Sequence, residues 1–393
     1  MRSFFVSVGE PSGDLLGAEL VSALKNHMPD FGGFGIAGPR LRSENYHEIA
    51  GIEELSVMGF VEVIKHITYL KKLEDRLILE IDRRKPEFAI LVDYPGFNMR
   101  LAEFLKVRDI PVIQYVAPQL WAWGEGRTSK LKAVTDLVLG IMPFEKDFFI
   151  DRGVTYQYVG TPQVDRASGA IKDHQAFKLD PQTPSVGFFP GSRNGEVSKM
   201  VPMAREIREC IRNSKKEIQF AVSIAPSVSY DAFLQLVSES QKDRLIGLKE
   251  GESVRIEDTT YVKGRSLDLM ASVSSALVTS GTATLECALV KTPLSVTYRM
   301  NKLSFALAKR LVKLDHVSLV NLVAGKAAIK EFIQEFTFEE VGEHLISLAS
   351  AGETRNQAVA ELNSLDRLVV GDLANGAARA IKKFLGEWDN SSP

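Results

Sequence analysis

The sequence predicts an α/β protein with two doubly wound domains, each built on a mostly parallel sheet. At 393 residues the chain is longer than one hydrophobic core usually grows. Short runs rich in Val, Ile and Phe alternate with helix-length amphipathic stretches, which is the pattern of parallel strands joined by crossover helices. This pattern stops over 160–184, a stretch that contains three prolines, and then starts again.

In the first half, six apolar runs are predicted as strands. They are Phe4–Val8, Phe34–Ala37, Phe88–Val92, Val112–Val116, Leu137–Ile141 and Tyr156–Val159. The clearest helix between them is His66–Arg84, where Ile67, Leu70, Leu73, Leu77 and Ile81 recur three or four residues apart. We expect this half to form an N-terminal domain over residues 1–165.

The second half repeats the pattern with five more predicted strands. They are Val186–Phe189, Ile218–Ser223, Val254–Ile256, Ala276–Thr279 and Leu294–Thr297. We expect them to form a second domain over 166–353. A helical stretch from about Thr354 to Glu387 follows Gly352, and this segment, 354–393, could pack on either domain.

The composition excludes several classes of protein. Hydrophobic residues make up 45% and charged residues 25%, which argues against disorder and coiled coils. A net charge of −2 leaves no global field for a polyanion, so we expect no nucleic-acid partner. Two cysteines, Cys210 and Cys287, fit a reducing compartment. With neither a signal-peptide pattern nor an apolar membrane span, we expect a cytoplasmic protein that can still touch a membrane surface.

Ligands of open α/β sheets bind beyond the carboxyl ends of strands, and two loops of the first half lie there. Gly9–Asp14 joins the first strand to a helix predicted to begin near Leu15, which Ser12 or Asp14 could simply cap. Asp93 ends the apolar run Phe88–Val92, so its carboxylate is a candidate general base with a raised proton affinity. The alternative is an aspartate that bonds the turn before Pro95.

Two loops of the second half have the residues of a nucleotide diphosphate site. Gly191 would let a ligand approach the backbone beside Ser192, and Arg193 could hold a diphosphate through two parallel bonds. The amides of a helix beginning near Ser280-Gly281-Thr282 would face an anion, and Glu286, one turn later, could accept both hydroxyls of a ribose. The alternatives are a solvated arginine and a helix cap with a buried glutamate.

Two further features have both a structural and a functional interpretation. Trp121 and Trp123 follow a strand, where aromatic residues either pack in the core or form a platform for a sugar. The segment Leu55–Ile64 is nearly all apolar and precedes Lys65, Lys71 and Lys72, so it is either core or a surface that dips into lipid.

Other motifs are weak or missing in the sequence. Gly33–Gly38 satisfies G-x-G-x-x-G but overlaps a predicted strand, which argues against a dinucleotide site. No Walker A lysine motif occurs, no cysteines and histidines fall at zinc spacing, and no D-x-D pair is found. We therefore expect neither a cofactor nor a metal.

Taken together, the motifs resemble the lipid A disaccharide synthase family, and the likeness extends over nearly the whole chain. The matching stretches are Gly9-Glu10, Ser12-Gly13-Asp14, Ala37-Gly38-Pro39-Arg40, Glu54 to Gly59, Trp121-Ala122-Trp123, Leu139 to Lys146, Pro190-Gly191-Ser192-Arg193, Ser280-Gly281-Thr282-Ala283, Leu285-Glu286-Cys287, Tyr298-Arg299-Met300, Val317-Ser318-Leu319 and Asn321-Leu322. Their order and spacing are far more specific than any single motif.

The resemblance implies an inverting, metal-independent glycosyltransferase with two Rossmann-like domains facing a cleft, the GT-B fold. It implies transfer from UDP-2,3-diacylglucosamine to 2,3-diacylglucosamine 1-phosphate, which gives a β-1,6 disaccharide and UDP for the lipid A of a Gram-negative bacterium. Asp93 would then be the base. The UDP-sugar side would comprise Ser192, Arg193, Ser280, Gly281, Thr282, Glu286, Arg299, Met300 and Asn321. The acceptor side would comprise Ser12, Gly13, Asp14, Asn98, Trp121 and Arg127.

The same resemblance implies peripheral association with the inner membrane. Its expected lipid-facing residues are Val57, Met58, Phe60, Val61 and Ile64, with Arg76 among the nearby basic residues. Size and class are compatible with a homodimer. Gly96, Gly124 and Thr161 depart from the family pattern and put the binding of the acceptor phosphate in question. The alternatives are another UDP-sugar enzyme, such as a hydrolysing epimerase, and a non-catalytic nucleotide or lipid binding protein.

Overall fold

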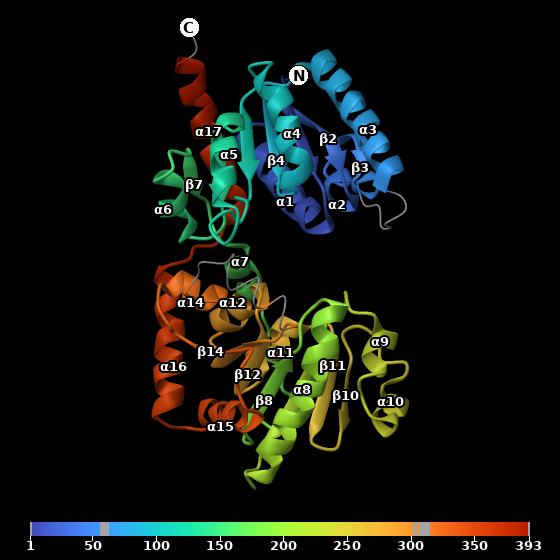
Figure 1. Ribbon diagram of the computed structural model, residues 1–393, viewed down its shortest axis with the longest axis vertical. Coiled ribbons are helices and arrows are strands. Elements are labelled where there is room, and N and C mark those ends of the chain that lie inside the picture. Colours follow the sequence, from blue (N-terminus) through green and yellow to red (C-terminus); the bar gives the residue numbers. More distant parts are fainter. Residues whose placement is uncertain (1, 56–62, 302–304, 306–314, 392–393) are drawn as a thin grey trace. The chain divides into compact units, whose positions relative to one another are not determined.

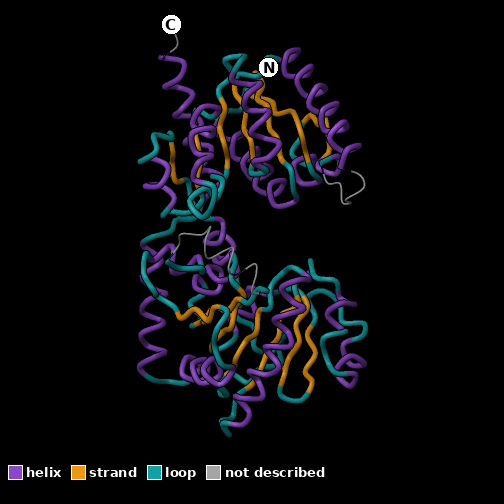
Figure 2. Tube along the Cα trace, in the orientation of Figure 1, coloured by secondary structure: helices purple, strands orange, loops and turns teal. Residues whose placement is uncertain are grey.

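The structure, a computed structural model, describes residues 2–55, 63–301, 305 and 315–391, and it divides into two units. The first unit comprises Met1–Pro162 and Val370–Pro393, and the second comprises Gln163–Val369. Each unit has a seven-stranded sheet with helices on both faces (Figure 2). The first unit ends three residues before the predicted boundary at 165, and the chain returns to it at Val370.

The sheet of the first unit is parallel throughout and has the order β3-β2-β1-β4-β5-β6-β7 (Figure 1). Its strands are β1 (Arg2–Val8), β2 (Phe31–Ala37), β3 (His47–Gly51), β4 (Phe88–Val92), β5 (Val112–Tyr115), β6 (Leu137–Gly140) and β7 (Tyr156–Tyr158). Its helices are α1 (Pro11–His27), α2 (Pro39–Arg42), α3 (Val63–Arg84), α4 (Pro95–Lys106), α5 (Thr128–Val134), α6 (Glu145–Ile150) and α17 (Leu373–Ser391). The strand order reverses between β1 and β4, so a crevice for a ligand is expected beyond their carboxyl ends.

The second unit has the order β10-β11-β9-β8-β12-β13-β14, parallel except for the β10–β11 hairpin. Its strands are β8 (Ser185–Phe189), β9 (Gln219–Ile224), β10 (Ser253–Ile256), β11 (Thr259–Lys263), β12 (Ser275–Thr279), β13 (Leu294–Tyr298) and β14 (Lys330–Ile333). Its helices are α7 (Pro162–Ser168), α8 (Asn194–Asn213), α9 (Tyr230–Leu234), α10 (Glu239–Leu245), α11 (Ser266–Ser272), α12 (Thr282–Leu289), α14 (Leu319–Ala324), α15 (Phe338–Ala349) and α16 (Glu353–Ser364). Here the order reverses between β8 and β12.

All eleven predicted strands form, with ends that differ by at most a few residues. The strands that the sequence analysis missed are β3, β11 and β14, and β3 and β14 are edge strands. An edge strand is covered less completely than a central one, so its sequence is more polar; His47-Glu48 in β3 is an example. β11 begins with Thr259 and Thr260, which are fully buried although their side chains are polar.

Two helix predictions need correction. The first helix begins at Pro11 rather than near Leu15, and neither Ser12 nor Asp14 caps it. Proline suits this first position because its missing N–H would have no partner within the helix. The stretch from Thr354 to Glu387 is not continuous, because α16 and α17 are separated by a break in which Asp372 has φ of 59°. The two helices belong to different units.

The C-terminal helix α17 completes the core of the first unit. Its buried Leu373, Ala377 and Ile381 join the same apolar cluster as Leu20 and Leu24 of α1. Figure 1 shows α17 in red and α1 in blue, because the two helices come from opposite ends of the chain. This part of 354–393 therefore packs on the N-terminal domain. Within the described residues, no helix is both long and apolar enough to cross a bilayer.

Candidate functional site

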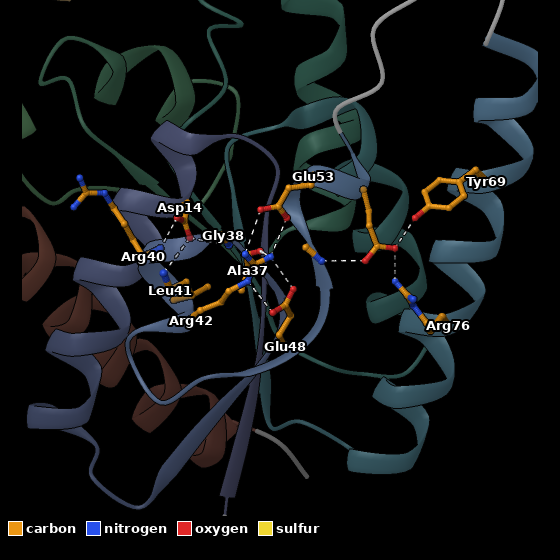
Figure 3. A network of polar contacts seen from close by, with 12 residues as sticks. Asp14, Ala37, Gly38, Arg40, Leu41, Arg42, Glu48, Glu53, Tyr69 and Arg76 are labelled. Atoms are coloured by element: carbon orange, nitrogen blue, oxygen red, sulfur yellow. Dashed lines mark hydrogen bonds and ion pairs between the residues drawn. The ribbon is translucent and has the colours of Figure 1, made fainter. Parts of the chain in front are cut away.

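Asp14 lies at the carboxyl edge of the first sheet but points into the protein (Figure 3). Its carboxylate is 2% exposed and accepts three backbone N–H groups, from Gly38 at 2.9 Å, Arg40 at 2.9 Å and Leu41 at 3.1 Å. These amides belong to the start of α2, which has no cap of its own. Asp14 is thus the anchor of α2, and its oxygens are not free for an acceptor or for proton transfer.

The other residues of this loop lie differently from Asp14. Ser12 is exposed in the first turn of α1. Gly13 is buried, and a Cβ added there would make an ordinary van der Waals contact with Val92. Glu10 is also exposed, and its backbone carbonyl accepts the N–H of Asp14. Of the predicted residues in this loop, Ser12 is the one whose side chain is open to a ligand.

Asp93 stands at the end of β4 in an uncommon backbone conformation. Its φ is 47° and that of Tyr94 is 48°, although neither residue is glycine. The Asp93 side chain is exposed at the edge of the sheet, but neighbouring protein atoms displace part of the water around its carboxyl group. This partial desolvation raises the pKa of the carboxyl above the usual aspartate value, against a backbone hydrogen bond from Tyr94. An exposed carboxylate with a raised proton affinity is suited to accept a proton.

Asn98, which the sequence places on the acceptor side, is fully buried. Its Nδ2 donates to the carbonyls of Val92 and Asp93, at 3.2 and 2.8 Å, and its Oδ1 accepts the hydroxyl of Ser7 at 2.7 Å. The whole amide is therefore used inside the protein. Asn98 contacts the backbone of the candidate base rather than a ligand.

The two tryptophans of the loop after β5 lie in different environments. Trp121 is half-buried against the ring of Phe144 and donates its indole N–H to Glu145. Trp123 is 55% exposed, and the guanidinium of Arg127 lies 4.7 Å from its ring centre. The predicted sugar platform is therefore better served by Trp123 with Arg127 than by Trp121. Residues two apart in an extended chain share a face, so no strand pattern in the sequence separates the two tryptophans; the turn at Leu120–Ala122 does.

Most of the predicted membrane segment, including Val57, Met58, Phe60 and Val61, lies outside the described residues, as does the side chain of Ile64. On its flanks, Glu54 accepts the hydroxyl of Tyr69 at 2.5 Å and pairs with Arg76 at 2.7 Å (Figure 3). Arg76 is thus engaged by a carboxylate within the protein. Lys71 and Lys72 are exposed.

In the second unit, the loop after β8 is ordered by Glu196. This carboxylate accepts the N–H of Ser192 at 3.3 Å and pairs with Arg193 at 2.8 Å. Gly191 has φ of 104°, which favours glycine, and a Cβ there would fall 2.5 Å from the same carboxylate and displace it. The Arg193 side chain remains 82% exposed, which lets its guanidinium turn toward a ligand.

A cavity of about 380 Å³ adjoins this loop at the carboxyl ends of β12 and β13. Its lining includes Arg193, Lys199, Thr279 and Arg299, and Glu196 is the one carboxylate among the described lining residues. Thr279 is 3% exposed, and its hydroxyl has no hydrogen-bond partner among the described residues. Cations together with an unpaired buried hydroxyl suit an anionic ligand. Lys199 and Thr279 were not predicted from the sequence, since neither belongs to a strand-end loop motif.

Arg299 and Met300 follow β13. The guanidinium of Arg299 lies 4.1 Å from the ring centre of Phe336 and donates to its carbonyl at 3.0 Å. The Nε of Arg299 is buried without a partner in the described part of the chain. The Met300 N–H donates to Gln334 at 3.2 Å. Arg299 is thus held by aromatic rings at the wall of the cavity.

The start of α12 is open in the described part of the chain. Its N-cap is Gly281; among the described residues no side chain caps it, and none of their atoms lies within 4 Å of where a Cβ of Gly281 would be. Ser280 and Thr282 flank this opening at the end of β12. One turn later, Glu286 is half-buried and pairs with Arg166 at 3.3 Å.

Asn321 is the exception in the predicted nucleotide site. It is 1% exposed, its Nδ2 donates to the Ile329 carbonyl and to Glu331, and its Oδ1 accepts the Ile329 N–H. Glu331 also accepts the N–H groups of Val317 and Ser318. Asn321 therefore ties α14 to the start of β14, and its amide is bonded within the protein rather than open to a nucleotide.

A model of the family described as lipid-A-disaccharide synthetase matches residues 4–369. The chain belongs to this family. It is a glycosyltransferase of lipid A disaccharide synthesis.

Relatives support this membership over nearly the full length. The lipid-A-disaccharide synthase of Trichlorobacter lovleyi is 38% identical over 337 residues, which is 85% of this chain and 84% of the relative. The lipid-A-disaccharide synthase of Myxococcus xanthus is 34% identical over 387 residues, 97% of each chain.

Solved structures show the fold. A glycosyltransferase from Rickettsia africae has a TM-score of 0.59 at 10% identity and covers 100% of this chain and 99% of its own. The UDP-GlcNAc 2-epimerase from Methanocaldococcus jannaschii has a TM-score of 0.57 at 11% identity, with 98% and 100% covered. The family member described here has the GT-B fold of two Rossmann-like domains. Because an epimerase and a transferase share this fold, the family match and not the fold favours the transferase.

Proposed function

We propose that the chain transfers the 2,3-diacylglucosaminyl group of its UDP ester to 2,3-diacylglucosamine 1-phosphate, with Asp93 as the general base. The observation that carries this proposal is the exposed Asp93 carboxylate with its raised pKa, at the point where the strand order reverses. The Asp14 carboxylate is buried and bonded to the start of α2, so it is not placed for this role.

The reaction proposed is a single in-line displacement. The 6-hydroxyl oxygen of the acceptor forms a bond to the anomeric carbon of the donor while its proton passes to Asp93. The bond from that carbon to the diphosphate breaks, and its electron pair leaves with UDP. Attack opposite to the leaving group inverts the configuration, which gives the β-1,6 linkage.

The donor diphosphate is assigned to the carboxyl edge of the second unit. Arg193, Lys199 and Arg299 around the 380 Å³ cavity supply positive charge, and the open start of α12 supplies amides. Glu286, one turn into α12, is the candidate acceptor for the ribose hydroxyls; Arg166, its present partner, is 46% exposed and can yield to them.

These cations would supply the field that a divalent ion supplies in other nucleotide-sugar enzymes, so we propose that turnover needs no metal. A chelator such as EDTA is expected to leave the rate nearly unchanged. Loss of activity with EDTA and recovery with Mg²⁺ would contradict this view of the leaving group.

One assay tests the transferase assignment. The chain is mixed with UDP-2,3-diacylglucosamine, with and without 2,3-diacylglucosamine 1-phosphate, and UDP release is followed. Release that requires the acceptor supports the transferase. Release without the acceptor indicates hydrolysis or epimerisation instead, and no release in either arm indicates a binding protein.

A further inference from the structure

The turn that presents Asp93 has a conformation that Tyr94 does not favour. Positive φ values occur mostly at Gly, Asn and Asp, and they are uncommon for a large residue such as Tyr94. Such a turn persists only when neighbouring groups hold it in place. Contacts from three neighbouring segments hold this turn.

The first group of contacts comes from Asn98, in the first turn of α4. Its Nδ2 donates to the carbonyl of Asp93 at 2.8 Å and to that of Val92 at 3.2 Å, so it fixes the peptides on either side of the base. The backbone N–H of Asn98 also donates to the Tyr94 carbonyl at 3.2 Å. One residue thus bonds three successive carbonyls across the turn.

The second contact comes from Ser7 of β1, which is fully buried beside β4. Its hydroxyl donates to Oδ1 of Asn98 at 2.7 Å. This bond fixes which way the amide faces, because a flipped amide would place its oxygen against two carbonyl oxygens. Ser7 and Asn98 are 91 residues apart in sequence; with the Ser7 bond, both N–H donors and the oxygen of the amide are engaged within the protein.

Two further neighbours limit the space around the turn. The Asp93 N–H donates to the Tyr115 carbonyl of β5 at 3.0 Å. A Cβ on Gly9 would fall 2.2 Å from Cγ of Tyr94, so the Tyr94 ring lies directly on the glycine that follows β1. The turn is therefore held from β1, β5 and α4.

We propose that Ser7 and Asn98 are positioning residues that hold the Asp93 carboxylate in place for proton transfer. The proposal rests on the function proposed for Asp93. Neither side chain is exposed, so neither contacts the substrate; each acts through the backbone of residues 92–94. Loss of the amide would let the turn relax toward ordinary negative φ values, and the carboxylate would move with it.

The test is a double-mutant cycle on the full chain with Ser7→Ala, Asn98→Ala and Asp93→Asn, measured with donor and acceptor. Asn98→Ala is expected to lower kcat by up to about 10²-fold, as misplacement of a catalytic group does, and Ser7→Ala less, with little change in either KM. In the Asp93→Asn background, both substitutions should lower kcat little further, because the group that they position is gone.

The matched control is Ser275→Ala, which removes another fully buried serine hydroxyl, bonded to the Leu345 carbonyl in the second unit. Its kcat should stay near that of the unaltered chain. Equal losses from Ser7→Ala and Asn98→Ala with and without Asp93 would overturn the positioning role while leaving Asp93 as the base. Near-normal turnover of Asp93→Asn alone would instead overturn the proposed base, and the positioning role with it.

Discussion

The indole N–H of Trp121 donates to Oε1 of Glu145 at 3.1 Å, and so a carboxyl that is 98% buried holds the loop after β5. The other oxygen of Glu145 accepts the Met142 N–H at 3.2 Å and the Tyr156 hydroxyl at 3.1 Å. Burial raises the pKa of Glu145 from 4.5 to about 7, although these hydrogen bonds oppose the change.

This burial predicts how stability depends on pH. Between pH 4.5 and about 7 the folded chain binds the Glu145 proton more tightly than the unfolded chain, so this residue makes stability fall as pH rises, by about 1.4 kcal/mol per pH unit. Glu145→Gln removes this dependence. The melting temperature should therefore fall less between pH 5 and pH 8 in the variant than in the unaltered chain. Glu103→Gln, an exposed site on α4, is the control, and parallel melting curves for Glu145→Gln and the unaltered chain would refute the prediction.

Replacing the proposed base should separate chemistry from nucleotide binding. Asp93→Asn keeps the shape and removes the proton acceptor, so kcat should fall by roughly 10²–10⁴. The affinity for UDP, measured by calorimetry, should stay near that of the unaltered chain, because Asp93 is not in the unit proposed to bind the nucleotide. Turnover within a few-fold of the unaltered chain would require a base other than Asp93.

The raised pKa of Asp93 also predicts the acid limb of the rate. The base acts when it is deprotonated, so kcat should rise with pH through a midpoint above that of an ordinary aspartate, about 3.9. A pH profile of kcat under saturating substrates measures this midpoint. A midpoint at or below the ordinary value would show that partial desolvation does not set the pKa of Asp93.

Lys199 is predicted to contribute to binding of the donor. Lys199→Gln removes a charge from the wall of the cavity and should raise the KM for the UDP-sugar several-fold at low salt, with a smaller effect at high salt. Lys216→Gln, an exposed lysine after α8, serves as the control and should have no effect. Equal KM values for the two variants would exclude Lys199 from the donor site.

Membrane contact is predicted from the sequence and the substrates. Moving an acyl chain into water costs about 0.8 kcal/mol per CH₂, so an enzyme for such substrates gains by working at a lipid surface. Changing Val57, Met58 and Phe60 to Ser should reduce binding to anionic vesicles in a sedimentation assay, while UDP affinity and melting temperature stay nearly constant. A collapse of the melting temperature would show that the segment is core, and unchanged sedimentation would place the membrane contact elsewhere.

The sequence by itself determined the α/β class, the family and the positions of the inner strands other than β11. These features depend on local patterns, because a buried parallel strand must be apolar along its length and a ligand loop must follow its carboxyl end. For the same reason Asp93, Arg193 and the open start of α12 could be found from the residue types that follow a strand. The polar edge strands β3 and β14 gave a weaker pattern and were missed.

Only the tertiary structure decided which polar side chains face a ligand and which face the protein. Asp14, Asn98 and Asn321 look like site residues in the sequence, yet each is buried and bonded to groups in other segments. Their partners include amides at the start of α2 and the hydroxyl of Ser7. A polar side chain turns inward when a neighbouring segment leaves backbone groups unpaired, and which segment lies beside it is set by strand order rather than by the residues next to it in sequence.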